Sequence, residues 1–340
     1  MRLERLLNLL GKSQILITGP NVFYFTGFSG EGWLLFDGKE FYLLTNKLYL
    51  EEAKQKVDFI NVVDGFNIEW LKKNLDEKDL FVDEVGLNVA EWEGLSASFE
   101  LIRVAKKVAR LRVNKDKYEV ENMKKACQIA ERVFEELLNV VRVGMTELEL
   151  VGYMYAKGLE LGAEDFSFYP IVATGAGSSV PHYKTSRKLI EEGILLIDFG
   201  FKYNGYCSDI TRTIFLKKVP DGFDKIYETV LKAKNEAFEK VRAGVKARKI
   251  DEVARSFIEN AGYGGKFIHG LGHGIGIEVH EMPAVSPGSE DSLDVGVTFT
   301  IEPGIYIEGK GGVRLEDDVY VGEKGVEWLS GPAGDIIVVT

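Results

Sequence analysis

The sequence predicts a mixed α/β (α+β) protein of two domains, a smaller α/β domain over residues 1–112 and a larger domain over residues 113–340. The length of 340 residues exceeds what a single hydrophobic core usually supports. Short runs rich in β-branched and aromatic residues alternate with segments of helical periodicity, which is typical of helices packed on sheets. A basic stretch, Lys106 to Lys117, separates the two parts and is interpreted as a solvated junction.

The smaller domain reads as alternating strands and helices. A tight turn at Asp37-Gly38 predicts a hairpin into the strand that follows it. The expected strands are Gln14–Thr18, Val22–Thr26, Trp33–Phe36, Phe41–Leu44, Phe59–Val63 and Leu80–Val82. The expected helices are Tyr49–Gln55, Ile68–Leu75 and Val89–Val104.

The larger domain carries longer helical patterns. Asn114 is expected to cap a helix whose buried face includes residues from Tyr118 to Leu138. Thr146 and Glu149 form a capping box for a second helix, which ends near Gly162. Two more helices are expected over residues 221–241 and 249–261, and strands over Leu195–Phe201, Ile210–Leu216, Ile275–Val279, Val297–Ile301 and Gly312–Val321.

Composition limits the classes of function. The net charge of −11 disfavours nucleic acid or an anionic membrane as a partner. No run approaches the ~18 apolar residues that span a bilayer, and no signal-peptide core is found, so a cytoplasmic location without a membrane is expected. Cys127 and Cys207 fit no zinc or redox spacing and are expected to be small buried residues.

The histidines point to a functional site. The chain has four, and all lie in the larger domain, at His182, His269, His273 and His280. Each one alone is more often a structural residue than a ligand. Together they stand close in sequence to acidic residues on apolar strands, which favours a metal or catalytic site.

Four acidic residues share the same setting, each in or at the end of an apolar run: Asp198, Asp209, Glu302 and Glu316. The strands of Asp198 and Asp209 are joined by a turn at residues 202–204, which would bring these two carboxylates side by side. A salt bridge explains any one such acid, but clustered carboxylates without cations would repel one another. An oxygen-rich site with one imidazole suits Mn²⁺, Co²⁺, Zn²⁺ or Fe²⁺.

These residues stand in motifs that resemble those of the pita-bread metallopeptidases: methionine aminopeptidase, aminopeptidase P and prolidase. The resemblance covers residues 114–340 and, more loosely, the first domain. Its motifs are Asp198-Phe199-Gly200, Asp209-Ile210-Thr211-Arg212-Thr213, the loop of residues 269–276, Thr300-Ile301-Glu302-Pro303-Gly304, Arg314-Leu315-Glu316-Asp317, Val180-Pro181-His182 and Val279-His280-Glu281.

The resemblance implies two divalent metal ions, first of all Mn²⁺ or Co²⁺, with Zn²⁺ or Fe²⁺ as alternatives. Their ligands would be Asp198, Asp209, His273, Glu302 and Glu316, with Asp209 and Glu316 bridging the ions. Glu302 would also act as general base, and His182 and His280 would contact the substrate. His269 is interpreted as a structural residue of its loop.

The first domain favours the branch of aminopeptidase P and prolidase, in which it serves substrate access and dimerisation. The residues from Ile17 to Phe28 resemble its opening segment. A homodimer is therefore expected, acting on small peptides with proline at the second position. The alternatives are a non-catalytic binding member of this fold and a methionine aminopeptidase.

One departure concerns substrate length. Prolidase-like members often carry Pro-Arg after His-Glu, and that arginine engages the substrate carboxylate. Here the segment after Glu281 is Met282-Pro283-Ala284, and alanine cannot bind a carboxylate. Aminopeptidase activity on longer peptides is thus as well supported as dipeptidase activity, unless Arg314 or a residue of the first domain replaces the missing arginine.

Overall fold

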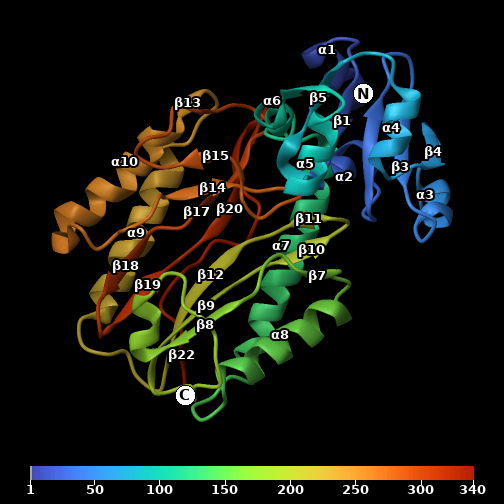
Figure 1. Cartoon of the computed structure of the whole chain (residues 1–340). Coiled ribbons are helices and arrows are strands. Elements are labelled where there is room, and N and C mark those ends of the chain that lie inside the picture. Colours follow the sequence, from blue (N-terminus) through green and yellow to red (C-terminus); the bar gives the residue numbers. More distant parts are fainter. Residues whose placement is uncertain (1) are drawn as a thin grey trace. The chain divides into compact units, whose positions relative to one another are not determined.

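The computed structural model describes residues 2–340, which divide into two compact units, residues 2–112 and 113–340 (Figure 1). Both combine helices with sheets, so the predicted α/β class is confirmed. Over the described residues, no helix is both long and apolar enough to cross a membrane.

The first unit is built on one mixed sheet of six strands in the order β4-β3-β2-β1-β5-β6. The strands are β1 (Ile15–Ile17), β2 (Gly32–Phe36), β3 (Phe41–Thr45), β4 (Asn61–Asp64), β5 (Asp79–Val82) and β6 (Glu100–Arg103). The helices are α1 (Arg2–Leu10), α2 (Pro20–Thr26), α3 (Leu50–Lys56), α4 (Ile68–Asn74), α5 (Val89–Ser96), α6 (Ala105–Arg110) and the 3₁₀ turn η1 (Glu84–Gly86). The predicted hairpin is confirmed, since β2 and β3 pair antiparallel with Phe36 opposite Phe41.

Two predictions for this unit are wrong. The segment Val22–Thr26 lies in helix α2, although valine, phenylalanine and tyrosine favour strands. Instead, a short helix begins with proline at its first position and ends at Gly27, which adopts the left-handed conformation. The expected helix Val89–Val104 stops at Ser96, and its last part forms strand β6 at the sheet edge beside β5.

Asp83 is a buried carboxylate in the core of the first unit. Its Oδ2 accepts a hydrogen bond from Asn21 Nδ2 at 2.7 Å, whereas Oδ1 has no hydrogen-bond partner among the described residues. Burial raises the pKa of Asp83 to about 6. The folded unit therefore holds the proton more tightly than the unfolded chain, in which the pKa is near 3.8.

The expected consequence is a pH-dependent free energy of unfolding. Because the folded pKa is raised, the stability linked to this proton is full below about pH 4 and is lost as the pH rises through about 6. Asp83→Asn is expected to remove this dependence and to stabilise the protein at pH 8 by up to about 3 kcal/mol. Urea unfolding of both proteins at pH 5 and pH 8 measures it, and an equal difference at the two pH values would contradict it.

The second unit has two halves, and the first consists of a sheet in the order β22-β12-β9-β8 covered by two helices. The strands are β8 (Ile171–Thr174), β9 (Gly193–Phe199), β12 (Ile210–Leu216) and β22 (Val338–Val339), and the helices are α7 (Lys117–Leu137) and α8 (Glu147–Glu160). All seven residues of β9 and of β12 are buried, including the charged residues Asp198 and Arg212. The predicted capping box of Thr146 and Glu149 is confirmed at the start of α8.

The second half repeats this arrangement with a sheet in the order β15-β14-β17-β20-β21. The strands are β14 (Gly272–Gly274), β15 (Glu281–Val285), β17 (Thr298–Ile301), β20 (Asp317–Gly322) and β21 (Gly325–Trp328), and the helices are α9 (Phe223–Lys240) and α10 (Ala247–Ile258). These helices share one hydrophobic core with β17 and β20. Figure 1 shows the two helix pairs on opposite sides of the strands.

Smaller pieces complete the second unit. They are the sheet β11-β10-β7, made of β7 (Asp165–Phe166), β10 (Phe201–Tyr203) and β11 (Tyr206–Cys207), and the pairs β13 (Val245–Lys246) with β16 (Ser292–Leu293) and β18 (Gly304–Ile307) with β19 (Gly311–Arg314). Single turns are η2 (Gly175–Ser179) and η3 (Glu259–Tyr263). The turn expected at residues 202–204 lies slightly later, because Asn204 and Gly205 adopt the positive φ angles that a tight hairpin needs.

Several local predictions for this unit are wrong. The expected strands Leu195–Phe201 and Gly312–Val321 are each divided between two strands of different sheets. Asp116, not Asn114, caps α7, and the Asn114 amide instead donates to Val295 O. Tyr118 is 58% exposed although it was expected on the buried face. Residues 275–279 form an irregular segment with bends rather than a strand, and the regular pairing of β14 ends at Gly274.

The two halves meet at their central strands. Thr211 of β12 forms an isolated antiparallel bridge with Glu316, which lies directly before β20. The Thr211 hydroxyl also donates to Glu316 Oε2 at 2.6 Å. This junction brings strands from both sheets to one place, where the candidate site lies.

Candidate metal centre

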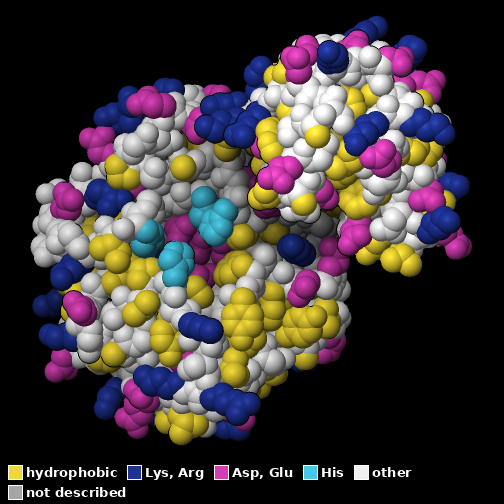
Figure 2. All heavy atoms as spheres, viewed as in Figure 1, with side chains coloured by type: hydrophobic (Ala, Val, Ile, Leu, Met, Phe, Trp, Pro, Cys, Tyr) yellow, Lys and Arg dark blue, Asp and Glu magenta, His cyan; other side chains and the backbone are white. Residues whose placement is uncertain are grey.

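A cavity of about 270 Å³ opens at this junction of the two halves. All five predicted metal ligands line it: Asp198, Asp209, His273, Glu302 and Glu316. All four histidines also line it. Figure 2 shows a hollow in which histidines surround acidic side chains. The structure thus brings together every residue that the sequence predicted for the site.

The first half supplies two aspartates. Asp198 lies on β9 and pairs with Thr211 of β12. Asp209 precedes Thr211 by two positions, directly before β12 begins. Because opposite residues and alternate residues of a sheet share one face, both carboxylates point to the same side. The pairing of β9 with β12 therefore places Asp198 and Asp209 side by side, as the sequence suggested.

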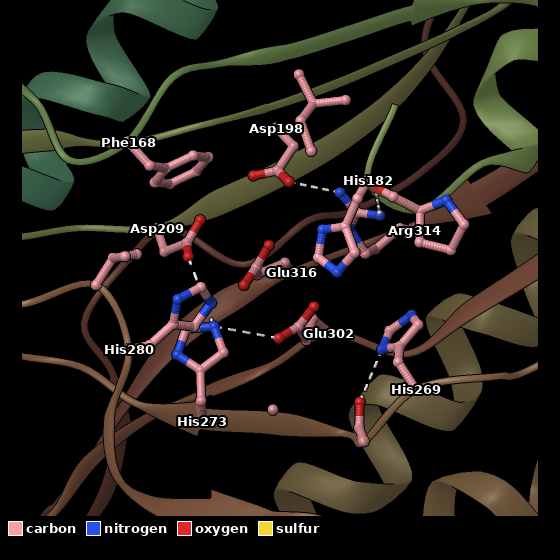
Figure 3. A pocket seen from close by; sticks show the side chains of 15 residues that line it. Phe168, His182, Asp198, Asp209, His269, His273, His280, Glu302, Arg314 and Glu316 are labelled. Atoms are coloured by element: carbon pink, nitrogen blue, oxygen red, sulfur yellow. Dashed lines mark hydrogen bonds and ion pairs between the residues drawn. The ribbon is translucent and has the colours of Figure 1, made fainter. Parts of the chain in front are cut away.

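The second half supplies the imidazole and two glutamates. His273 lies in β14, Glu302 follows β17 directly, and Glu316 precedes β20. The Nε2 atom of His273 lies 3.3 Å from Glu302 Oε1 and 3.7 Å from Asp209 Oδ2. One ligand atom from each of Asp209, His273 and Glu316 lies within 4.8 Å of the others. Figure 3 shows these side chains turned toward a common point.

The ring of His273 is oriented for ligation. Its Nδ1 lies 3.1 Å from the carbonyl oxygen of Gly274, which leaves Nε2 facing the acids. Burial, with a smaller contribution from His280, lowers the pKa of His273 to about 4, so the imidazole is neutral at pH 7. Glycine at 272 is required here, because a Cβ atom would stand 2.0 Å from Thr300 O on the neighbouring strand.

The carboxylates are in an environment that calls for cations. Burial and the neighbouring acids raise the pKa of Asp209 and of Glu316 well above their ordinary values. Burial raises the pKa of Glu302 to about 8. The Oδ1 atoms of Asp198 and Asp209 are buried and have no hydrogen-bond partner in the described part of the chain. Divalent cations would take these oxygens as ligands and would remove the repulsion between the carboxylates. This set of ligand atoms therefore fits the predicted metal ions.

A second layer of contacts holds Asp209 in place. Its backbone N–H donates to Asp318 Oδ2 at 3.0 Å, and the Cys127 thiol donates to the same oxygen at 3.3 Å. Cys127 and Cys207 are both buried and free, as expected. The role of Cys127 beside Asp318 was not predicted, because these two residues lie 191 positions apart in the chain.

Arg314 also lines the cavity, next to Asp198. It was considered as a receptor for a substrate carboxylate, but its side chain is buried and engaged. Its Nη2 pairs with Asp198 Oδ2 at 2.5 Å, and its Nη1 donates to Tyr306 Oη at 3.0 Å. The only signal in the sequence was its position two residues before Glu316.

The remaining three histidines differ in setting. His182 and His280 are both exposed at the rim, and His280 also packs its ring against His273 with centroids 4.2 Å apart. His269 is bound at both nitrogens, to Gly270 O at 2.8 Å and to Tyr306 Oη at 2.9 Å, which agrees with a structural role. Phe168, which the sequence argument missed, adds an aromatic wall to the cavity (Figure 3).

Comparison with known families agrees with this geometry. Residues 121–323 match metallopeptidase family M24, and residues 2–114 match the creatinase/prolidase N-terminal domain. Together these matches cover both units of the chain.

Individual relatives resemble the whole chain. An Xaa-Pro dipeptidase of Pyrococcus furiosus is 36% identical over 97% of each chain. The structure of an Xaa-Pro dipeptidase from Bacillus anthracis is similar with a TM-score of 0.93, at 34% identity over 99% of each chain. That of an X-Pro aminopeptidase from Thermotoga maritima has a TM-score of 0.91, at 37% identity over the full length of both chains. The chain therefore belongs to metallopeptidase family M24.

Proposed function

We propose that this protein hydrolyses the peptide bond between an N-terminal residue and proline with the help of two divalent metal ions. The observation that carries this function is the convergence of four carboxylates and one neutral imidazole on one cavity. Full-length similarity to Xaa-Pro peptidases supports the choice of substrate. Members of this fold that only bind peptides generally lack metal ligands, and the complete set here favours an enzyme.

The ligands would be Asp198, Asp209, His273, Glu302 and Glu316, and Mn²⁺ or Co²⁺ are the ions proposed first. When bound, such ions supply a water of lowered pKa and positive charge for the developing oxyanion. The chain's own contribution is to hold these side chains at fixed distances around the cavity and to keep His273 neutral.

Three side chains would act on the substrate. Glu302, 3.3 Å from His273 Nε2, accepts the proton of the attacking water and passes it to the leaving proline nitrogen. His280 stands beside His273 (Figure 3) and holds the substrate carbonyl. His182 at the rim donates a hydrogen bond to the oxyanion or to the leaving group.

The preferred peptide length is proposed from the surroundings of Ala284. This residue is exposed and pairs with His273 across β14 and β15, so it shares a face with that ligand. An arginine in this place would reach the metal cavity, but alanine offers no partner for a carboxylate, and Arg314 is already engaged. We therefore propose activity on peptides longer than two residues in addition to dipeptides.

Three expectations from the sequence stay predictions. They are a homodimer, a cytoplasmic location, and a contribution of residues 1–112 to substrate access and dimerisation.

Metal removal tests the proposed function. Protein stripped with a chelator is expected to lose hydrolysis and to regain it with Mn²⁺ or Co²⁺, since no other described group supplies an activated water. The substrates are Ala-Pro, a longer peptide beginning Ala-Pro, and a peptide beginning Met-Ala. Cleavage of the Met-Ala peptide alone would show a methionine aminopeptidase, and no cleavage of any substrate with Mn²⁺, Co²⁺, Zn²⁺ or Fe²⁺ would refute the proposal that the protein is an enzyme.

A further inference from the structure

Glu147 is a buried carboxylate that the metal centre does not use. It is the first residue of α8, and its exposed fraction is 0%. Its Oε1 accepts a hydrogen bond from Thr174 N at 3.2 Å. Its Oε2 accepts three more, from Tyr183 Oη at 3.2 Å and from Ser186 N and Oγ at 3.0 Å each. A single side chain therefore binds four donors.

Three of the four donors belong to Tyr183 and Ser186, in the segment that links β8 to the strand β9 that carries Asp198, and the fourth is Thr174 N at the end of β8. His182 lies in this segment, directly before Tyr183. On the other side of His182, the carbonyl oxygen of Pro181 accepts a hydrogen bond from Arg314 Nη1 at 3.3 Å. His182 thus stands between two anchors, one provided by Arg314 and the other by Glu147.

The chemistry of Glu147 explains why this anchor is stiff. Its four donors are neutral groups, and its position at the start of α8 places the carboxylate at the positive end of the helix dipole. A buried carboxylate is tolerated only when its oxygens are well satisfied. Moving the segment would therefore leave a buried charge without partners, which keeps residues 174–186 in one conformation.

We infer that Glu147 is a positioning residue, which holds the His182 segment so that the imidazole faces the metal cavity. This inference deepens the proposed function and rests on the proposed contact between His182 and the substrate. Glu147 itself does not line the cavity, so its effect on turnover would pass through His182.

The test is a double-mutant cycle of Glu147→Gln with His182→Ala in the metal-loaded protein. Glutamine keeps the size of the side chain but replaces one accepting oxygen by a donor. Glu147→Gln is expected to lower kcat by about 10-fold to 100-fold, because small displacements of a catalytic group are costly. Bound metal is expected to stay as in the wild type. In the His182→Ala background, the same change is expected to lower kcat by less than about 2-fold.

Glu149→Gln is the matched control. Glu149 lies in the same first turn of α8, but it is exposed and its side chain bonds only to Thr146. The kcat of the Glu149→Gln variant is expected to stay within about 2-fold of the wild-type value. If Glu147→Gln fails to fold, Tyr183→Phe replaces it in the cycle, because this change removes one contact of Glu147 next to His182.

Two results would overturn the inference in distinguishable ways. Equal losses of kcat in both backgrounds would show that Glu147 does not act through His182, and the proposed function would stand. A normal kcat for His182→Ala alone would instead remove the proposed role of His182, and with it the reason for positioning this residue.

Discussion

Glu302→Ala is expected to lower kcat by about 1,000-fold or more, the upper range for loss of a general acid and base. Glu302 stands 3.3 Å from His273 Nε2 and accepts a hydrogen bond from Thr300 Oγ1 at 3.2 Å. No other acid in the described part of the cavity is placed at the end of β17, so no neighbour takes its position.

The same substitution is expected to leave the metal-free protein folded and at least as stable as the wild type. Burial raises the pKa of Glu302 to about 8, and the nearby Asp198 adds to this effect. Alanine removes one of several acids that repel each other in the absence of cations. In contrast, the rise in Tm that metal ions give the wild type should be reduced, because fewer ligands remain.

Steady-state kinetics and thermal unfolding with and without Mn²⁺ measure both effects. Glu308→Ala is the control, since Glu308 is an exposed residue between β18 and β19, outside the cavity. Turnover near the wild-type rate in the Glu302 variant would contradict its assignment as general base. A metal-free variant that unfolds at a much lower temperature would contradict the repulsion among the acids.

His182→Ala is expected to lower kcat by about 100-fold while the bound metal remains unchanged. The side chain is exposed at the rim of the cavity, so its removal should not disturb the core. It also lies outside the group of Asp209, His273 and Glu316 whose ligand atoms converge. A lower kcat with unchanged metal content would therefore indicate that His182 contacts the substrate and does not bind metal.

Metal content by elemental mass spectrometry, measured beside kcat and KM, separates the possibilities. Lys184→Ala is a matched control, because Lys184 is exposed on the same segment two positions away. If metal occupancy falls with activity, His182 is a ligand and the ligand set is wrong.

Local patterns predicted part of the fold well. Strand β12 has the predicted bounds Ile210–Leu216, and the capping box of Thr146 and Glu149 begins α8 as expected. These features depend on neighbours in the sequence, so the chain encodes them locally. The strand predicted at Val22–Thr26 was wrong because the helix signals at Pro20 and Gly27 outweighed the preference of these side chains for strands.

The candidate site was predicted by residue type and motif but not by arrangement. Its ligands were named because carboxylates within apolar strands are costly without a cation. Their distances depend on pairings across long stretches of chain, such as that of Thr211 with Glu316. The engagement of Arg314 and the anchoring of His182 by Glu147 depend on contacts of the same long-range kind.

The sequence alone thus determined the family, the α/β class and the identity of the candidate ligands, since hydrophobic period and motif chemistry are local properties. Only the tertiary structure decided which carboxylates lie beside His273 and which lies beside Arg314. It also decided which polar side chains are already engaged in structural hydrogen bonds. The physical reason is that hydrogen bonds and burial between distant strands are set by packing, which no local pattern records.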